Sequence, residues 1–386
     1  MCSHLPEAIG CYVHIPFCVR KCAYCDFNSF SGYTDQSVTR YVNALTREIR
    51  LAPQLPDAAS TFVDTIFFGG GTPTAIPADD EAALLRAVLE TLPITEDAEI
   101  TTEANPGTMD VEHLATLRAA GFNRISFGVQ SFDAGLLKTL DRIHTVNEAK
   151  SAVKAARSAG FENISIDLMF ALPRQTLTQW RETLEQALAL ETEHLSLYSL
   201  IVEEGTGFYT LQQKGRLPLP SDDLAADMYE LAVETTEAAG YQQYEIANFA
   251  QPGRECRQNL HYWRNEPYYG FGCGAVSYLH GSRRMNLKSP AGYARAMEVE
   301  ANLTLSLETL TAEETMAETM MLGLRLTREG VDCRRFQERF GIDPREKFAS
   351  EIETFTRRGL LELSGWCLRL TPPGVFLASE VMVAFV

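Results

Sequence analysis

Three cysteines within eight residues, Cys18, Cys22 and Cys25, are the residues of this chain best suited to hold a metal centre. Thiolates are soft ligands that suit iron–sulfur clusters, zinc and copper. A closed zinc site or a conventional cubane site takes four protein ligands, but the next position within reach, Phe27, is apolar. The spacing therefore predicts a metal centre that keeps one position open, as a reactive cluster requires. The competing interpretation is that all three are ordinary buried cysteines.

The elements that would position these cysteines are short apolar runs alternating with longer amphipathic ones. We expect six strands, over residues 11–15, 65–68, 99–103, 124–129, 165–169 and 194–200. We expect five helices between them, over residues 35–51, 79–92, 110–120, 147–159 and 177–190. Gly121 and Gly160 follow two of these helices, where a terminating glycine is common. A strand alternating with a helix six times predicts an α/β fold with parallel strands and right-handed crossovers, a partial (β/α)6 barrel of the TIM type.

Polar or glycine-rich segments stand at or near the C-terminal ends of these strands. They are the three cysteines, Gly69–Pro73, Glu103–Pro106, Gln130–Ser131, and Asp167 in the fifth strand. In barrels built from βα units this end of the strands is the functional face. Each segment alone has a structural explanation as a tight turn, a helix cap or a buried polar group. Their repeated placement predicts one shared site.

The last third of the chain changes character. Glycines and prolines over residues 201–223 indicate loops, followed by a helix over 224–239, a strand over 244–246 and an aromatic, glycine-rich stretch over 256–278. Helices are expected over 312–326, 334–340 and 347–358, and a hairpin over 360–370. We therefore divide the chain into a core barrel (1–240), a connecting region (241–290) and a mainly helical, winged-helix-like domain (291–386).

Charge and cysteine content narrow the functional classes. The formal net charge of −17 opposes attraction to nucleic acid or to an anionic membrane surface. Nine cysteines, an odd number, without a secretory signal over residues 1–10, favour reduced thiols in the cytoplasm. No apolar run is long enough to span a bilayer, so we do not expect an integral membrane protein.

Several motifs together resemble a known family. Cys18-x3-Cys22-x2-Cys25 and Gly69–Pro73 resemble the cluster and glycine motifs of radical S-adenosylmethionine (radical SAM) proteins. Five further segments look like the branch related to oxygen-independent coproporphyrinogen III oxidase: Tyr12–Cys18, Glu103–Gly107, Gly128–Phe132, Asp141–His144 and Asp167–Met169. Within that branch, Phe27 and the short N-terminus resemble HemW-type haem chaperones, because the oxidases usually carry a further cysteine where Phe27 stands.

The resemblance implies cofactors and a set of residues that bind them. Cys18, Cys22 and Cys25 would hold a [4Fe–4S] cluster whose open iron binds SAM, which electron transfer can cleave to methionine and a 5′-deoxyadenosyl radical. The residues that would contact SAM are Tyr12, Gly70, Gly71, Thr72, Glu103, Gln130, Arg142 and Asp167, and Tyr24 could touch the adenine or shield the cluster. Their chemistry agrees: carboxylates bind ammonium or ribose hydroxyls, and arginine pairs with a carboxylate.

The haem-binding part of the pattern departs from the family. HemW-type proteins typically carry His-Asn-x-x-Tyr-Trp. The corresponding run here is Gln258, Asn259, Leu260, His261, Tyr262 and Trp263, with glutamine in place of the histidine. The family's Gly-Ala-His run reads Gly274–Val276, a second lost histidine. Glutamine is a poor ligand for haem iron. His261, Cys256 or Cys273 could substitute, or His261 could be a hydrogen-bonded histidine with a structural use.

The resemblance thus implies a haem chaperone that carries haem as cargo to an acceptor protein, with a flavodoxin or ferredoxin as a possible reductant. The alternatives are oxidative decarboxylation of coproporphyrinogen III, SAM-dependent methyl transfer, and a simple metal-binding or structural protein. Phe27 argues against the oxidase.

Overall fold

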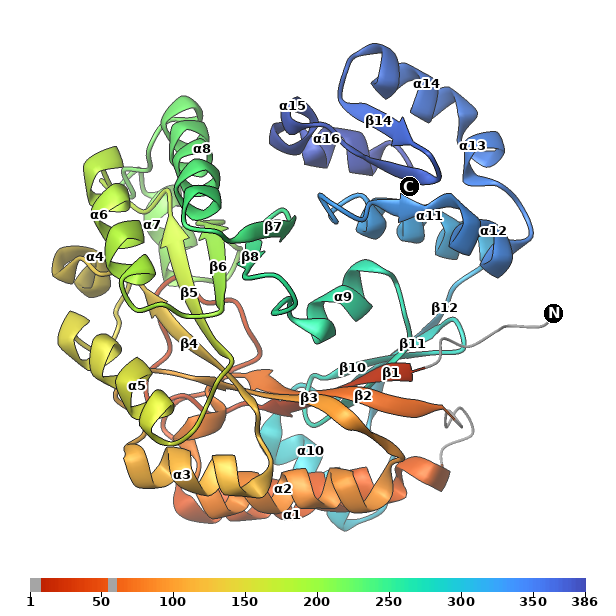
Figure 1. Ribbon diagram of the computed structural model, residues 1–386. Helices are drawn as coiled ribbons and strands as arrows, with labels where there is room; N and C mark the ends of the chain where they lie inside the picture. The colour runs from red at the N-terminus through yellow and green to blue at the C-terminus, as the bar shows by residue number, and fades with distance from the viewer. Residues whose placement is uncertain (1–7, 55–60) are drawn as a thin grey trace.

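The structure is a computed structural model that describes residues 8–54 and 61–386 of the chain (Figure 1). Its main feature is a 12-stranded sheet whose centre is six consecutive parallel strands. These strands are β1 (Ala8–Ile15), β2 (Phe62–Gly70), β3 (Ile94–Ala104), β4 (Arg124–Gln130), β5 (Ile164–Phe170) and β6 (His194–Ser199). The predicted α/β barrel-type fold with six parallel strands is confirmed.

Helices cross between successive strands and cover the outer face of the sheet (Figure 1). They are α1 (Asp35–Leu51), α2 (Ala78–Thr91), α3 (Val111–Ala120), α4 (Ala134–Thr139), α5 (Val146–Ser158) and α6 (Leu177–Leu188), with short 3₁₀ turns at Ala52–Gln54 and Pro73–Ala75. Thr34, Thr145 and Thr176 each begin a helix with a capping box, which satisfies amide groups that a helix start leaves unpaired. Five of the six were predicted within a few residues, and α4 was not.

The segment over residues 201–223 differs from the prediction of loops alone. Helix α7 (Gly207–Gln213) forms there, because Thr206 caps it by accepting from the Tyr209 amide and Phe208 is buried. Phe208 packs with Leu136, Leu140 and other apolar side chains in a small separate cluster. Helix α8 (Asp222–Ala238) follows, close to the predicted range. The glycine-based loop prediction was therefore wrong over this one helix, since burial of Phe208 outweighs the local turn signals.

The aromatic stretch and its flanks extend the sheet at both edges. Strands β7 (Gln242–Glu245) and β8 (Asn248–Ala250) form a hairpin, antiparallel to β6. After α9 (Arg257–Trp263), strand β9 (Tyr268–Phe271) pairs parallel to β1, and β10 (Val276–Leu279), β11 (Ser282–Asn286) and β12 (Thr304–Thr309) continue outward. Helix α10 (Pro290–Glu298) packs on α1, and its buried Tyr293 belongs to the main core. The boundaries at 240 and 290 stay predictions.

The C-terminal region has a core of its own, which includes Met320, Leu324, Phe336 and Leu368. Its helices are α11 (Ala312–Gly323), α12 (Cys333–Phe340), α13 (Pro344–Lys347), α14 (Ala349–Arg357), α15 (Pro372–Phe376) and α16 (Ala378–Val383). A three-stranded antiparallel sheet joins them: β13 (Val331–Asp332), β15 (Cys367–Leu370) and β14 (Leu361–Ser364). This helical region with a small sheet agrees with the predicted mainly helical domain.

Helix α9 lies between the barrel sheet and the C-terminal region (Figure 1), with contacts to β1, β2 and α11. The Arg264 side chain pairs with Glu329 at 2.6 Å, and Arg325 pairs with the buried Glu245 at 2.9 Å. These ion pairs tie the C-terminal region to the barrel. Over residues 8–54 and 61–386, no helix combines the length and apolarity needed to cross a membrane.

Candidate functional site

The cysteine loop begins where β1 ends. Cys18 follows directly after Phe17, and the backbone closes the loop through Phe30 N–H donating to Pro16 O (2.7 Å) and Cys18 N–H to Phe30 O (3.0 Å). The Lys21 ammonium donates to the carbonyls of Phe27 (2.9 Å) and Ser29 (3.3 Å). The loop is therefore fixed at both ends and across its middle without using any of its three thiols.

The thiols lie in a partly buried environment. Cys18 Sγ is 3.6 Å from Thr72 Oγ1, and Cys22 Sγ accepts from Arg142 Nη1 at 3.4 Å. Burial raises the pKa of Cys18 and of Cys25, so a metal centre that binds their thiolates would release protons. The charge of Arg142 opposes that effect at Cys18, and the charge of Lys21 opposes it at Cys25.

The thiols suit a cluster better than a single ion. In the part of the chain that the structure describes, no three His, Cys, Asp or Glu side chains form a group that could hold one metal ion. A cubane distributes its cysteine ligands over separate irons, so the thiols need not converge on one point. Three thiols on one pinned loop, with no fourth protein ligand among them, fit a cluster with one open iron.

The glycine segment packs directly against the exit of β1. Gly71 N–H donates to Ile15 O and Thr72 N–H to Phe17 O, each at 2.8 Å. A β-carbon on Gly71 would lie 2.7 Å from Phe17 O, and Gly70 has a φ of +113° with the His14 ring beside its α-carbon. Only glycine allows this approach of two backbones. The segment thereby holds the cysteine loop against β2.

Two partly buried carboxylates lie on neighbouring parts of the sheet, Glu103 near the end of β3 and Asp167 in the middle of β5. Glu103 Oε2 accepts from the Gly70 amide at 3.2 Å, and Asp167 Oδ1 accepts from Ser126 Oγ at 3.1 Å. Burial, and then the nearby Asp167 charge, raise the pKa of Glu103 to about 8; burial also raises the pKa of Asp167. A cationic group or sugar hydroxyls would relieve two carboxylates held in this environment. The predicted roles of both residues in binding SAM are chemically consistent with their positions.

Arg142 joins the cysteine loop to the strand ends. Besides Cys22, its guanidinium donates to the Asn105 amide oxygen and to the Gly128 carbonyl. Asn105 in turn donates to Thr72 Oγ1 at 2.7 Å. The chain reverses beside this network at Gln130, whose φ of +69° is unusual outside glycine. Four segments distant in sequence are thus held by one hydrogen-bonded network.

Tyr24 lies within hydrogen-bonding reach of Arg142 and close to helix α7. Its ring is 6.3 Å from that of Phe208, and the Phe208 amide donates to Ala23 O at 2.9 Å. Burial raises the pKa of Tyr24, while Arg142 lowers it. Helix α7 therefore packs against the loop at Ala23 and Tyr24. The predicted role of Tyr24 beside the adenine or the cluster stays a prediction.

A cavity of about 350 Å³ opens next to these groups. Tyr12, Gly70 and Glu103 line it, and so do Tyr262 and Val276 from the segments beyond β8. Phe27, 61% exposed, contributes to the same lining. Residues predicted to contact SAM and residues of the predicted haem region therefore share one cavity at the C-terminal ends of β1 and β2.

All five residues of the predicted haem region lie on α9. Gln258 is buried, with Oε1 accepting from Thr65 Oγ1 at 2.6 Å, and its amide lies against Gly10. Asn259 donates to the Tyr244 hydroxyl at 3.2 Å. The Arg325 guanidinium carbon lies over the Trp263 ring, 4.2 Å from the ring centroid. Of the five residues predicted for this region, Tyr262 lines the cavity.

His261 is enclosed by two carboxylates. Its Nε2 lies 2.6 Å from Asp64 Oδ1 and its Nδ1 lies 2.7 Å from Glu266 Oε2, and the side chain is 8% exposed. Burial alone would lower its pKa, but the hydrogen bonds and charges of Asp64 and Glu266 outweigh burial and raise the pKa to about 9. A protonated imidazole has both nitrogens as donors. In this arrangement His261 has no lone pair for iron.

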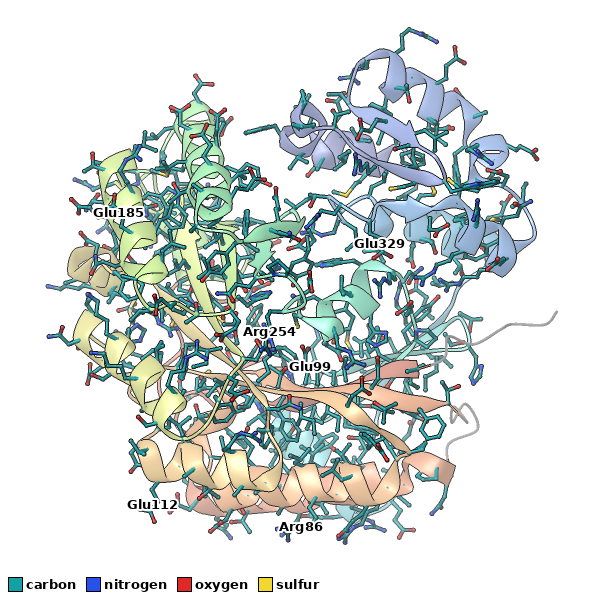
Figure 2. The ribbon with its side chains drawn as sticks, in the orientation of Figure 1. Arg86, Glu99, Glu112, Glu185, Arg254 and Glu329 are labelled. Carbon is teal, nitrogen blue, oxygen red and sulfur yellow. The ribbon has the colours of Figure 1, made fainter. Side chains whose placement is uncertain are left out.

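Cys256 and Cys273, the other predicted substitutes, are also enclosed. Cys256 Sγ is 3.7 Å from Glu99 Oε1. The Glu99 side chain lies in the interior of the molecule (Figure 2). Burial raises the pKa of Cys256 to about 12. Cys273 Sγ is 3.7 Å from Asn28 Nδ2, and burial raises its pKa to about 12 as well. Both thiols are therefore neutral near pH 7.

Three residues of the site were not singled out from the sequence. His14 donates from Nε2 to Asn28 O (2.9 Å), so its Nδ1 in the neutral ring accepts from the Tyr12 hydroxyl (2.9 Å), and the ring lines the cavity. Asn105 connects Arg142 to Thr72. Asn28 reaches across to the Cys273 and Lys288 carbonyls, each at 3.0 Å. His14 and Asn105 stand inside recognised motifs, which was the signal available for them.

Comparison with known proteins agrees with these motifs. Residues 12–187 match the radical SAM superfamily, and residues 310–377 match the HemN C-terminal domain. The haem chaperone HemW of Bacillus subtilis is 41% identical to this chain, over 97% of this chain and 98% of the relative. HemW of Escherichia coli K12 is 41% identical over 76% of this chain and 77% of the relative.

A solved structure has the same fold. The coproporphyrinogen III oxidase HemN of Escherichia coli, described as a radical SAM enzyme, aligns with a TM-score of 0.83 at 24% identity. The alignment covers 100% of this chain and 91% of that one. At this identity the likeness concerns the fold, and it extends through the C-terminal region.

Proposed function

We propose, because this chain belongs to the HemW family of radical SAM proteins, that it binds haem at the cavity beside its cysteine loop and passes the haem to an acceptor protein. The observation that carries the proposal is the shared lining of that cavity. Tyr12 and Glu103, expected to contact SAM, face it together with Tyr262 and Val276, which stand in the family's two haem-associated runs. Cargo and cofactor would thus meet in one place.

The cofactor part of the proposal rests on the donor set. Cys18, Cys22 and Cys25 would hold a [4Fe–4S] cluster, and the cluster would supply an open iron for the amino and carboxylate groups of SAM and an electron to SAM. Glu103 and Asp167 offer carboxylates to the cationic and hydroxyl groups of SAM. Arg142 keeps the cysteine loop in register with the strand ends through Cys22 and Asn105.

The haem part of the proposal relies on apolar surface more than on a preformed ligand. The cavity is at the lower end of the range of about 300–1,000 Å³ that is usual for ligand sites. Phe27, Tyr262 and Tyr268 give it aromatic walls, and the Tyr262 and Tyr268 rings meet edge to face at 4.8 Å. A flat apolar macrocycle suits such walls. His261 is held by its carboxylates and would not be the axial ligand.

No observation favours the alternative activities over haem transfer. The likeness to the coproporphyrinogen III oxidase structure concerns the fold, and Phe27 occupies the position of the oxidases' additional cysteine. The HemW chaperone of Bacillus subtilis aligns along nearly the whole chain. The acceptor, a flavodoxin-like or ferredoxin-like reductant and a cytoplasmic location belong to the same proposal.

The proposal is tested by removing one wall of the cavity. Phe27→Ala deletes an exposed ring that lines the cavity, and Phe30→Ala deletes a ring of the same loop that does not. Covering about half of a phenyl ring with haem is worth about 1.4 kcal/mol, so Phe27→Ala should weaken haem binding about tenfold. Phe30→Ala should leave the affinity unchanged. The measurement is a spectroscopic haem titration of anaerobically reconstituted protein.

Equal haem affinity in the wild type and in Phe27→Ala would contradict the assignment of the cavity. Because Phe27 and Phe30 are 61% and 39% exposed, neither substitution removes a buried core side chain. A change in both variants would indicate damage to the loop instead, which the cluster absorbance of the two proteins reveals.

A further inference from the structure

A second, larger cleft lies between the barrel and the C-terminal region, away from the cysteine loop. Its volume is about 750 Å³. Helix α8 and strand β7 form one wall, and strands β14 and β15 with helix α15 form the other (Figure 1). None of its lining residues belongs to the cavity described above. It is therefore a separate feature that haem transfer, as proposed, does not use.

The floor of this cleft is apolar and aromatic. Tyr229 on α8 meets Phe376 on α15 edge to face, with ring centroids 5.4 Å apart, and Val233 and Val375 lie beside them. The Phe376 side chain, which lines the cleft, is 49% exposed. Large apolar side chains gathered in a cleft and left half-covered indicate a surface that another molecule covers.

One rim of the cleft is acidic. Glu230, Glu234 and Glu237 lie on a single face of α8, because positions i, i+4 and i+7 of a helix share a face. All three are exposed, and over the described residues none of them forms an ion pair. On the opposite wall Arg369 pairs with Glu362 at 2.6 Å. Arg328 is a further exposed cation in the lining and forms no ion pair within the described residues, so three glutamates face one unpaired arginine and the unpaired charge is mainly negative.

The sheet edge in the cleft is closed to an added strand. Strand β7 ends the 12-stranded sheet, which would invite pairing with an extended peptide. However, the Thr327 amide donates to Tyr244 O at 3.1 Å and the Thr327 hydroxyl donates to Gln243 O at 2.9 Å. The C-terminal region therefore already occupies two backbone carbonyls of β7 and stands in the way of an added strand. An occupant must therefore bind through side chains, as an amphipathic helix does in a groove.

We propose that the cleft between α8 and α15 is a docking groove for a cationic amphipathic helix of a partner protein. The apolar face of such a helix covers Phe376, Tyr229 and Val233, and its lysines or arginines pair with the Glu230, Glu234 and Glu237 row. Charge complementarity excludes an acidic segment and an anionic lipid surface from this groove. Because its walls come from both the barrel and the C-terminal region, the occupant also fixes the two relative to each other.

The test uses a fluorescein-labelled 18-residue peptide of leucine and lysine with helical amphipathic spacing, titrated with the full-length protein by fluorescence anisotropy. Glu230→Lys/Glu234→Lys/Glu237→Lys should weaken binding about tenfold or more, as expected for the loss of three exposed ion pairs. The matched control is Glu90→Lys/Glu112→Lys/Glu185→Lys, which changes the net charge equally. These glutamates are exposed on other helices, and Glu112 and Glu185 point outward, away from the cleft (Figure 2).

The groove is supported if the α8 triple variant loses affinity, the control triple variant keeps it, and Phe376→Ser also weakens binding about fivefold or more, the loss expected from half of a phenyl contact. It is overturned if the peptide does not bind, or if both triple variants weaken binding equally, since net charge alone would then explain it. Equal binding of a leucine–glutamate peptide of the same spacing would also overturn it. The substituted side chains are all exposed, and thermal unfolding verifies that each variant is folded.

Discussion

The carboxylate clamp around His261 gives a prediction whose size follows from the structure. Replacing His261 by glutamine keeps a hydrogen-bonding side chain but removes the charge that Asp64 and Glu266 hold. The folded pKa of about 9 lies above the ordinary value of 6.5, a difference worth about 3 kcal/mol in total. The side chain is 8% exposed, so solvent screens little of this.

The sign follows from the raised pKa. The folded state binds the proton more tightly than the unfolded chain, so the stabilisation is fully present below about pH 6.5 and is lost as pH rises through about 9. The stabilisation from protonated His261 is about 2.5 kcal/mol at pH 7, and only a few tenths of a kcal/mol of it remain at pH 9.5. Wild type should therefore exceed His261→Gln in stability at pH 7 and lose most of that advantage by pH 9.5.

The assay is denaturant unfolding of the wild type and of His261→Gln at both pH values. Other groups titrate over this range, but they are common to both proteins and cancel in the difference. His280→Asn is the matched control, because His280 is exposed at a turn with a φ of 49° that asparagine tolerates. A stability gap of the same size at pH 7 and pH 9.5 would refute the clamp. The same variant should keep its haem affinity, since His261 offers no lone pair.

Three further predictions concern the cysteine loop and its surroundings. Cys22→Ala should abolish the cluster absorbance of reconstituted protein, whereas Cys367→Ala, in the C-terminal sheet, should retain it; retention in both would mean that the ligand assignment is wrong. Gly71→Ala should destabilise the protein by about 1–3 kcal/mol in denaturant unfolding, because its β-carbon would lie 2.7 Å from Phe17 O; unchanged stability would show that the two backbones can separate freely. The SAM affinity measured by calorimetry should rise between pH 7 and pH 9, because the Glu103 carboxyl, with its pKa of about 8, ionises there and attracts a cationic ligand. Glu103→Gln should flatten this rise, and an identical rise in the variant would assign the pH dependence to another group.

The parallel strands and the site at their ends could be predicted because both leave local signals. Buried strands read as apolar runs, and the residues after them fall on one edge whatever the details of closure. Helix α7 and the sheet extension over β9 to β12 left weaker signals. Glycines and prolines suggested loops around α7, and the aromatic, glycine-rich stretch that holds β9 indicated no strand. The pairing of β9 with β1 joins residues about 260 positions apart.

The parts of the site that sequence could not reveal are the long-range polar contacts. Asp64 and His261 are 197 positions apart, and nothing near His261 in the sequence indicates which carboxylates enclose it apart from Glu266. The same holds for Arg142, whose partners Cys22 and Asn105 are 120 and 37 positions away. Such contacts exist only once the sheet has assembled, so a motif can name the residue but not its charge state.

The most direct test of the central claim compares haem binding with porphyrinogen turnover in one anaerobically reconstituted sample. We predict saturable binding of about one haem per chain, seen as a Soret shift, and no propionate decarboxylation when coproporphyrinogen III, SAM and a reductant are supplied. The cavity beside Cys18, Cys22 and Cys25 would then be a haem site. Steady decarboxylation of coproporphyrinogen III, with stoichiometric release of 5′-deoxyadenosine and no Soret shift with haem, would contradict the account.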